Sequence, residues 1–407
     1  MPALTMNLDQ ATRVRVVDWL TVLLAVSLPW STSATGILSV LWLVAVVFTL
    51  TREDRDVLFT PAGGLPVLLV LLGAAGMAWA DVSLAERWDG LTSFLKLLFI
   101  PLLFVHFRRS ERGMGVFVGY ALSCTALLIV SYGIAWLDIL FTRDFGVPVK
   151  NAATQSGEFV TCIFGAAYLA QDWLARKRWI LAVAAIALIS AMFVNIVFVA
   201  LGRTALLMNF LLLGLFVSLH LSWRSIVVVI VGVAFVAGMA WSSSPYLRER
   251  TEELRTELQR YETSGARTSS GERIEFAKRS LGFIRQAPLF GHGTGTIHNL
   301  FEKAAAGKTG AAGVAAANPH NQTFAVGIQL GILGIAVLWA MWIAHLLLFR
   351  GGGLVAWVGL VVVVQNIIGS AFNSHLFDFL QGWTYVVGVG VAGGMMLRAR
   401  ANRGARP

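Results

Sequence analysis

The sequence Asn318-Pro319-His320-Asn321 places residues suited to acid–base chemistry at the start of a long apolar run. Asn318 is a favourable helix N-cap, and Pro319 suits the first helical position. His320 then follows in the first turn, where the positive end of the helix dipole favours a neutral imidazole. Because a neutral imidazole accepts a proton, we expect His320 to act as a general base at a membrane boundary. The alternative is a polar residue that only marks the interface.

Two arginines, Arg203 and Arg273, are placed where they can bind an anion. Arg203 follows a long apolar run, and an arginine at a membrane span is costly unless it has a partner or a function. Guanidinium groups match phosphate oxygens in a bidentate way, so the two side chains together can hold a diphosphate. Arg279 is a weaker third candidate, because an arginine on an amphipathic helix usually faces solvent or lipid headgroups. For Arg203 the alternative is an arginine that extends to the interface.

Three further residues, His292, Asn321 and His375, are accessory candidates. His292 lies in the turn Gly291-His292-Gly293-Thr294-Gly295, whose backbone amides can face an anion. His375, in Asn373-Ser374-His375-Leu376-Phe377-Asp378, can line the same cavity as His320, and Asn321 directly follows His320. No HExxH motif or close acidic pair occurs near the same membrane boundary, so we predict no metal ion and no cofactor.

The composition is typical of a helical membrane protein. The chain has 407 residues, of which 57% are hydrophobic and 13% are charged. Its continuous apolar runs, separated by short charged clusters, predict an all-α polytopic membrane protein and disfavour a membrane β-barrel. The net charge of +10 lies largely in clusters beside apolar runs, so we do not expect a nucleic-acid partner. Cys124 and Cys162 fall inside apolar runs and indicate neither a disulfide framework nor a metal site.

The apolar runs predict about twelve transmembrane helices. Their expected ranges are 16–29, 37–50, 64–80, 91–107, 116–141, 159–174, 179–201, 205–219, 226–241, 322–349, 354–372 and 380–397. The first run has a signal peptide as its alternative, but the second follows so closely that the pair predicts a membrane hairpin. We therefore divide the chain into about nine N-terminal helices in 1–241, a large loop in 242–320, and about three C-terminal helices with a short tail in 321–407.

The positions of arginine and lysine predict the orientation in the membrane. If the N-terminus is cytoplasmic, most basic clusters flanking the spans also fall in the cytoplasm. The opposite short loops hold only Arg87, Arg143, Lys150 and Arg203. The positive-inside rule therefore predicts that both termini are cytoplasmic and that loop 242–320 is periplasmic. That compartment has no nucleotide supply, so a transferase acting there must use a donor already activated on a lipid carrier.

The large loop is predicted to contain helices. Apolar residues at helical spacing between Leu247 and Tyr261, interleaved with charges, predict an amphipathic helix that Ser264-Gly265 ends. Ser269 and Glu272 match a capping box that opens a second helix, which Pro288 ends. The segment from Ala304 to Ala317 is rich in alanine and glycine, which predicts a lid or a disordered loop.

The second half of the chain resembles the O-antigen ligase and polymerase superfamily. The resemblance rests on Gly202-Arg203-Thr204, Gly271-Glu272-Arg273, Ala287-Pro288-Leu289-Phe290-Gly291-His292-Gly293, and His320-Asn321 before Gln329-Leu330-Gly331-Ile332-Leu333-Gly334. It implies a C-type glycosyltransferase (GT-C) fold in the bacterial inner membrane and metal-independent transfer of a glycan from undecaprenyl diphosphate. It also implies that Arg203 and Arg273 bind the diphosphate and that His320 is the essential histidine.

The favoured activity is ligation of O-antigen to a sugar hydroxyl of lipid A-core with inversion. The single large outer loop with its histidine favours a ligase over a polymerase of the same superfamily. The polymerase is kept as the alternative. A protein O-oligosaccharyltransferase is disfavoured, because His375-Leu376 departs from the histidine-serine motif of those enzymes. From another class, a transporter or flippase of the same lipid-linked glycan would show two similar halves, and we find no such repeat. The expected partners are the lipid-linked donor, the lipid A-core acceptor and membrane lipids.

Overall fold

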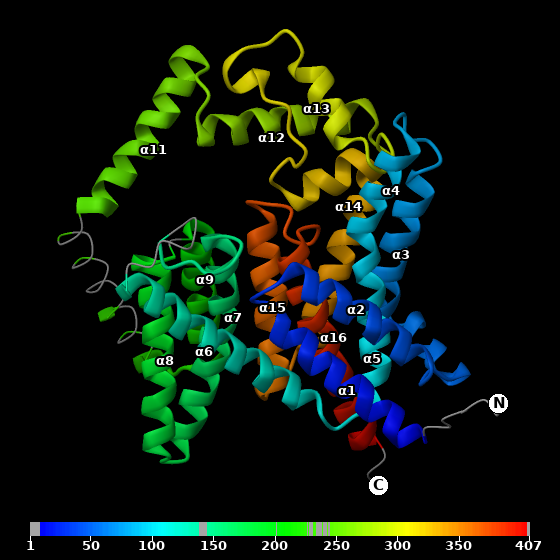
Figure 1. Cartoon of the computed structure of the whole chain (residues 1–407), viewed down its shortest axis with the longest axis vertical. Coiled ribbons are helices and arrows are strands. Elements are labelled where there is room, and N and C mark those ends of the chain that lie inside the picture. The colour runs from blue at the N-terminus through cyan, green and yellow to red at the C-terminus, as the bar shows by residue number, and fades with distance from the viewer. Residues whose placement is uncertain are drawn as a thin grey trace.

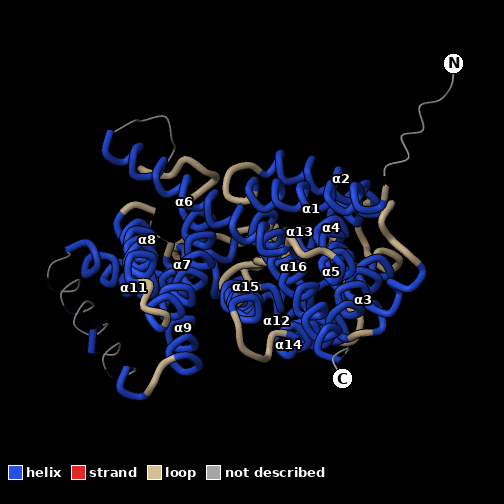
Figure 2. The backbone as a smooth tube through the Cα atoms, turned by 90° about the horizontal axis from the view of Figure 1, so that it is seen from below, coloured by secondary structure: helices blue, strands red, loops and turns tan. Residues whose placement is uncertain are grey.

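A computed structural model describes residues 9–137, 145–200, 202–225, 227, 231–232, 238, 242 and 245–404. In these residues the chain folds into helices joined by loops (Figure 1, Figure 2), and no strand occurs among them. The described part of the chain is therefore all-α, as the continuous apolar runs predict.

Helices occupy nearly all the expected apolar runs. From the N-terminus to residue 220 they are α1 (Gln10–Ser27), α2 (Thr32–Val47), the 3₁₀ helix η1 (Arg52–Phe59), α3 (Pro61–Gly76), α4 (Leu84–Leu95), η2 (Lys96–Leu98), α5 (Phe99–Arg109), α6 (Gly113–Leu137), α7 (Ala152–Ala175), α8 (Trp179–Phe198) and α9 (Arg203–His220). The expected span 226–241 lies outside the described residues except for a few positions. After the polar segment come α14 (Gln322–Leu348), α15 (Leu354–Ser370) and α16 (Phe379–Gly404).

Six of the described helices or helix runs are long and apolar enough to cross a membrane, and a seventh is counted if η1 and α3, bent by 86°, form one span. The six are Leu84–Arg109, α6, α8, α9, α14 and Phe379–Arg403, while α2 and α15 are shorter apolar helices. The described helices are thus consistent with a polytopic membrane protein. They do not confirm the expected number of about twelve spans.

Two apolar cores hold the helices in two groups, and α15 joins them. One core packs α1, α2, α3, α5, α14 and α16 together, and the other packs α6, α7, α8 and α9. Val363 of α15 belongs to the first core, whereas Trp357 and Val361 of the same helix belong to the second. Figure 2 shows α15 between the two groups of helices. The first two helices pack as a hairpin, in which Trp42 donates a hydrogen bond to Thr21 Oγ1 at 2.7 Å, but neither is among the six candidate spans, so a membrane hairpin stays a prediction.

The polar segment before α14 covers one end of the bundle (Figure 1). It contains α11 (Pro245–Ser264), α12 (Ser269–Gln286), α13 (Ile297–Ala305) and the short 3₁₀ helix η3 (Gly310–Gly313). The two predicted helices are confirmed as α11 and α12, but the predicted cap is wrong by one residue. The N-cap of α12 is Thr268, which accepts a hydrogen bond from Gly271 N at 3.1 Å, because the Glu272 carboxylate pairs with Arg267. The helix α13 was not expected.

The alanine-rich segment is anchored rather than free, contrary to the expectation of a lid or a disordered loop. Ala311 and Ala316 are buried, and Ala311 N donates a hydrogen bond to Gly265 O at 3.0 Å. Small side chains let this segment pack closely against α12, which explains a composition that resembles a flexible linker.

The helix α14 is broken at Gly331, which has φ +63°. Ile332 N donates a hydrogen bond to Pro288 O at 2.8 Å, so the loop after α12 supplies an acceptor for an amide that the break leaves without its helical partner. A side chain at this glycine would lie 2.4 Å from the carbonyl carbon of Leu289. Only glycine fits this close approach, and residues 322–330 therefore form a separate half-helix that carries the region around His320.

Candidate functional site

His320 lies just outside the start of α14, in a left-handed backbone conformation with φ +53°. The expected cap is therefore wrong by three residues: Asn321, not Asn318, is the N-cap, and its side chain accepts a hydrogen bond from Phe324 N at 3.0 Å. Asn318 instead closes a local turn, because its Oδ1 accepts from His320 N at 2.9 Å. His320 thus sits next to the helix N-terminus but not in its first turn, and strain of this kind often marks functional positions.

The His320 ring is half-buried and has a defined orientation. Its Nδ1 lies 3.0 Å from Asn373 Oδ1. One face of the ring lies against Phe276 of α12, with the ring centroids 6.0 Å apart and the planes 20° from parallel. Among the described residues nothing hydrogen-bonds Nε2, so this nitrogen is free to meet a substrate.

Asn373 belongs to the loop 371–378, between α15 and α16, and connects His320 to Asp378. Its Nδ2 donates a hydrogen bond to Asp378 Oδ2 at 2.6 Å, and its Oδ1 also accepts from Asn318 Nδ2 at 3.0 Å. Ser374 Oγ donates to Asn318 Oδ1 at 2.7 Å, which closes the network. Side-chain amides therefore hold the turn before α14 against the loop after α15.

Lys96 anchors the same loop from the other side. Its ammonium donates hydrogen bonds to the carbonyl oxygens of Phe377 at 2.9 Å and Asp378 at 2.8 Å, and the residue is buried. Burial raises the pKa of the Asp378 carboxyl, while the positive charges of Lys96 and Lys150 oppose that rise. Sequence reasoning missed Lys96, Asn373 and Asp378. The available signal was a lysine inside an apolar run and a polar cluster around His375 between two apolar runs.

Arg273 lies one helical turn before Phe276, the residue that covers the His320 ring, so α12 brings this arginine towards the histidine. Its side chain is exposed and makes no hydrogen bond or ion pair with any described residue. Arg273 is therefore free to bind an anion.

Arg203 begins α9 and is likewise exposed, with no partner among the described residues. The preceding Gly202 packs against Ser156 of α7, where an added side chain would lie 2.8 Å from Oγ. The same end of α7 reaches α16 through the 3.4 Å contact between Thr154 and Gln381, three residues after Asp378. Through these contacts the structure brings the start of α9 to the same end of the bundle as the loop 371–378.

Arg279 is placed differently from these two arginines. Its terminal nitrogens donate to the carbonyl oxygens of Val314, at 3.2 Å, and Ala312. The side chain is largely buried, and its Nε lies 3.9 Å from Glu275 Oε2. Arg279 thus holds the alanine-rich segment onto α12 and has little capacity left for a diphosphate.

The glycine turn containing His292 is used for packing. His292 Nε2 lies 2.9 Å from Phe283 O. The backbone amides of residues 291–295 all donate to protein oxygens, including those of Ile328, Gln329 and Gly76. No amide of the turn is left for an anion. The turn instead fastens α3, α12 and α14 to one another.

The accessory residues Asn321 and His375 also have structural surroundings. Asn321 caps α14 and its Nδ2 donates to Ala371 O at 3.2 Å, which ties the helix start to the loop 371–378. His375 packs against the backbone of Gly369 and lines a small polar pocket with Glu158 and Asn366. Burial lowers the pKa of His375 to about 4. His375 is therefore neutral at ordinary pH, and the pocket that it lines does not include His320.

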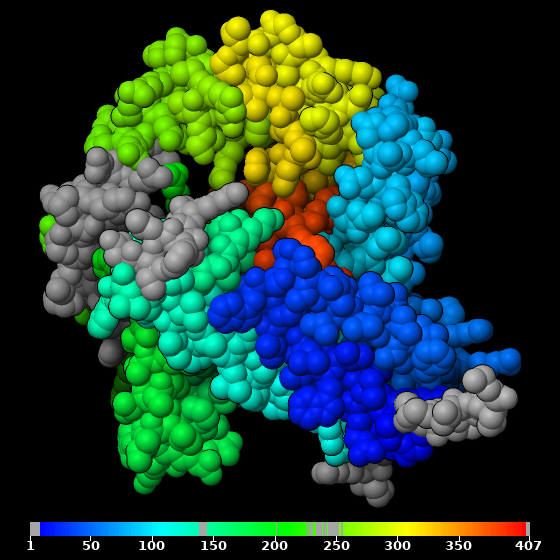
Figure 3. Space-filling view, viewed as in Figure 1, coloured from blue at the N-terminus to red at the C-terminus, as the bar shows by residue number. Residues whose placement is uncertain are grey.

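A polar cavity of about 470 Å³ lies beside the Asn318-Pro319 turn. It is bounded by α4, α13, the first half of α14 and the loop 371–378, and its polar side chains are Glu86, Asp89, Ser93, His298, Asn318, Gln329, Ser374 and Asp378. Its volume is within the range of about 300–1,000 Å³ typical of small-molecule sites. In Figure 3 the molecular surface is hollowed beneath the polar segment, and the orange surface following α14 is visible at its floor.

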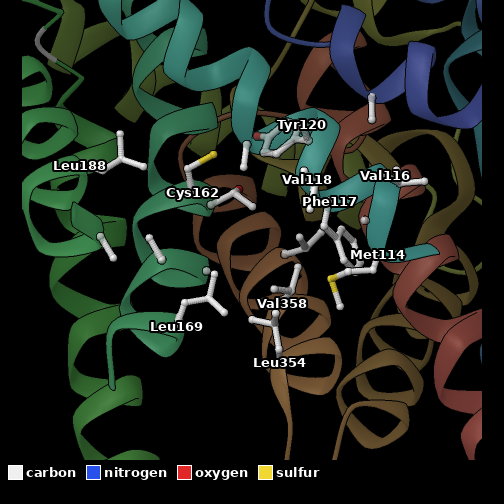
Figure 4. Close-up of a pocket in the computed structure, with 18 of the residues that line it drawn as sticks. Met114, Val116, Phe117, Val118, Tyr120, Cys162, Leu169, Leu188, Leu354 and Val358 are labelled. Atoms are coloured by element: carbon white, nitrogen blue, oxygen red, sulfur yellow. The ribbon is translucent and has the colours of Figure 1, made fainter. Parts of the chain in front are cut away.

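A second cavity, of about 370 Å³, is apolar and lies among the helices (Figure 4). Residues of α6, α7, α8, α15 and α16 line it, including Phe117, Cys162, Leu188 and Val358. Tyr120, Thr161 and Thr384 stand at its polar edge, and the last two also line the small pocket that contains His375. This cavity can hold a hydrocarbon chain but offers little to a charged group.

The described residues contain no group of three or more His, Cys, Asp or Glu side chains arranged to hold a metal ion. No curated protein matches the chain. The family model described as O-antigen ligase matches residues 187–339, a range that includes Arg203, Arg273 and His320 but not Asn373 or Asp378. This match indicates a glycosyltransferase-type enzyme that uses lipid-linked sugar and lipid acceptor substrates. Residues 187–339 of this chain are thus similar to the O-antigen ligase family.

Proposed function

We propose that this protein transfers an O-antigen glycan from undecaprenyl diphosphate to a sugar hydroxyl of lipid A-core. The observation that carries the proposal is that Nε2 of His320 and the guanidinium groups of Arg203 and Arg273 are free of partners among the described residues, at one end of the bundle. A base for the acceptor hydroxyl and cationic groups for the departing diphosphate are the two kinds of group that such a transfer uses.

The donor diphosphate is gripped by Arg203 and Arg273. Both guanidinium groups can offer two parallel N–H donors to phosphate oxygens. We assign Arg279 to holding the alanine-rich segment, because carbonyl oxygens already occupy its terminal nitrogens. The prenyl tail leaves sideways between helices, and the apolar cavity in Figure 4 has the lining to take part of such a chain.

The acceptor sugar occupies the polar cavity beside Asn318. Hydroxyl groups donate hydrogen bonds to carboxylates, and Glu86, Asp89 and Asp378 line this cavity. The same carboxylates repel a diphosphate, so the cavity suits the acceptor better than the donor. Figure 1 shows α4, which bounds the cavity, and α9, which begins with Arg203, on opposite sides of the bundle. Donor and acceptor therefore approach from different sides.

The reaction is an inverting displacement. His320 Nε2 removes the proton from the acceptor hydroxyl as that oxygen attacks the anomeric carbon from the face opposite the diphosphate. The new C–O bond forms as the bond between the anomeric carbon and the diphosphate oxygen breaks. The products are the glycosylated acceptor, undecaprenyl diphosphate and a protonated histidine that returns its proton to water. The two arginines stabilise the negative charge that develops on the departing diphosphate, so no metal ion is required.

This chemistry fits an enzyme of the bacterial inner membrane whose site faces the periplasm. The positive-inside distribution supports cytoplasmic termini and a periplasmic segment 242–320 between N-terminal helices in 1–241 and C-terminal helices in 321–407. The site then lies where lipid-linked glycans are the available activated donors. A GT-C-like arrangement accounts for this combination of helices and outer segment.

The test is reconstitution of the full chain in detergent or vesicles with a lipid-linked glycan and lipid A-core. We expect glycan covalently attached to lipid A-core, with the same rate in EDTA, and with inverted anomeric configuration. Absence of transfer would refute the proposal, and loss of activity in EDTA would refute the metal-free mechanism. Elongated glycan that stays on undecaprenyl diphosphate would instead identify a polymerase. Movement of unmodified donor across the vesicle membrane would identify a transporter.

A further inference from the structure

We infer that Asn373 is a positioning residue that fixes the tautomer of His320, and that Asp378 in turn fixes the orientation of Asn373. This inference rests on the proposed function of His320 as a base. It concerns how the histidine is prepared for that role, and it names two residues outside the matched range 187–339.

The partners of Asn373 determine which end of its amide faces the histidine. Asp378 Oδ2 lies 2.6 Å from one terminal atom of the amide, and a carboxylate oxygen at this distance requires a donor. That atom is therefore Nδ2, and the oxygen Oδ1 is directed to the other side. There it also accepts from Asn318 Nδ2 at 3.0 Å, which is consistent with the same assignment.

The orientation of the amide then determines the proton on the ring. Because Asn373 Oδ1 can only accept a hydrogen bond, His320 Nδ1, at 3.0 Å, must carry a hydrogen and donate it. In a neutral imidazole the other nitrogen, Nε2, is then unprotonated and can accept a proton. The hydrogen-bond chain from His320 through Asn373 to Asp378 thus selects the basic form at the free nitrogen.

The backbone at His320 supports the same arrangement. A non-glycine residue at φ +53° is strained and persists only where its surroundings hold it. Asn318 provides this support, because its Oδ1 accepts from His320 N and Ser374 Oγ while its Nδ2 bonds Asn373. Phe276 covers one face of the ring, with the ring centroids 6.0 Å apart.

The first test compares Asn373→Leu with Asn299→Leu, a control in α13 whose side chain makes no hydrogen bond with described residues. Leucine has a similar size but offers no acceptor to Nδ1, so the ring samples both tautomers and orientations. We expect kcat to fall about 10²-fold, with KM for donor and acceptor unchanged. The control should transfer glycan at the wild-type rate. An Asn373→Leu enzyme with kcat within twofold of wild type would overturn the inference.

A second variant, Asn373→Asp, separates positioning from general packing. Two neighbouring carboxyl groups share a proton, so Asp378 would donate to the new carboxylate, which keeps an oxygen for Nδ1–H. We expect Asn373→Asp to keep kcat within about tenfold of wild type. If both variants lose activity equally while folding normally, the acceptor oxygen is not what matters and the inference is wrong. If Asn373→Leu fails to fold, Asn373→Asp and the spectroscopic test decide.

The spectroscopic test does not depend on transfer activity. The chain has seven histidines, so ¹⁵N-histidine labelling with His320→Gln as the reference assigns the His320 ring signals. We expect wild-type protein without substrate to show protonated Nδ1 and unprotonated Nε2, and Asn373→Leu to show averaged signals. Protonated Nε2 in the wild type would overturn the inference even if the enzyme is active. The expected tautomer in a protein that transfers no glycan would instead support the inference and refute the proposed function.

Discussion

The turns around His292 and His320 differ in how their polar groups are used. In the first, His292 Nε2 faces the Phe283 carbonyl at 2.9 Å, and the backbone amides of residues 291–295 all have protein acceptors. In the second, His320 Nδ1 is held at 3.0 Å from Asn373 while Nε2 has no partner among the described residues. Each ring is thus held at one nitrogen, and the difference lies in the surroundings. The His292 turn uses all its backbone amides to join helices, whereas His320 has a left-handed backbone, with φ +53°, next to a turn that lines a polar cavity.

The arginines of α12 show the same difference within a single helix. Arg279 bonds two carbonyl oxygens of the alanine-rich segment and is largely buried. Arg273, less than two turns earlier, is exposed and has no described partner. The chemical type of a side chain therefore does not identify the site, but the unused hydrogen-bonding capacity does.

The largest expected effect distinguishes His320 from His292. His320→Ala should lower kcat about 10³-fold, because it removes the base, and should leave thermal stability near that of wild type. His292→Ala should do the reverse: it removes one of the two hydrogen bonds to the Phe283 carbonyl, which keeps the one from Ala287 N, and costs about 1 kcal/mol of folding free energy, while transfer per folded molecule stays within a few fold. Transfer assays and thermal unfolding of both variants measure this. Equal losses of activity would remove the distinction between the turns.

The next largest expected effect distinguishes Arg273 from Arg279. Arg273→Lys keeps the charge but loses the bidentate fork, so kcat/KM should fall about 10²-fold, which matches the loss of one strong charge-assisted hydrogen bond. Arg203→Lys should behave similarly. Arg279→Lys should mainly lower thermal stability, because it weakens the contact with residues 312 and 314. The assignment of the diphosphate site is contradicted if Arg279→Lys weakens donor use more than Arg273→Lys does.

Much of the fold was predictable because hydropathy and turn chemistry are local. The apolar run expected at 322–349 matches the start of α14 at Gln322, and turn residues placed the end of α11 at Ser264, whereas the caps expected at Asn318 and Ser269 lie at Asn321 and Thr268. The break within α14 was harder to predict from the sequence. The kink at Gly331 exists because the Leu289 backbone packs 2.4 Å from where a side chain would be, and a contact between residues 42 positions apart leaves no local signature. The packing of the alanine-rich segment, fastened by Arg279, was hidden for the same reason.

The candidate site was predictable in its residue types and less so in its connections. Histidine at the boundary and arginine after a span are unusual enough to single out His320 and Arg203 from sequence. Their partners are common residues: Asn373 and Asp378 are polar residues between two apolar runs, and Lys96 is a single lysine inside an apolar run. Their importance comes from hydrogen bonds that cross more than 50 positions, as between His320 and Asn373, or 280, as between Lys96 and Phe377.

Substitution of Lys96 tests whether a buried residue that bonds only to the protein can still affect the transfer reaction. Lys96→Met removes the hydrogen bonds from the ammonium to the carbonyl oxygens of Phe377 and Asp378, of which the second keeps Gly382 N as a donor, so the loop 371–378 should hold Asn373 less firmly. We expect kcat to fall about tenfold at unchanged donor KM, a smaller effect than losing Asn373 itself. Lys303→Met, an exposed lysine in α13, is the matched control. Wild-type kcat in Lys96→Met would show that the loop does not need this anchor.

The smallest effect on transfer is expected at His375, a third histidine, which is buried and neutral. Its pKa is lowered by burial to about 4, below the value of about 6.5 expected in the unfolded chain. The unfolded chain therefore binds a proton between pH 6.5 and 4 that the folded protein does not, so stability falls as the pH decreases through this window. His375→Phe removes this dependence. Between pH 7 and pH 5 its unfolding temperature should drop less than that of wild type, while transfer at pH 7 should change by less than twofold. An unaltered pH dependence would show that His375 is not kept neutral by the fold. A large loss of transfer would place His375 with His320 rather than with His292.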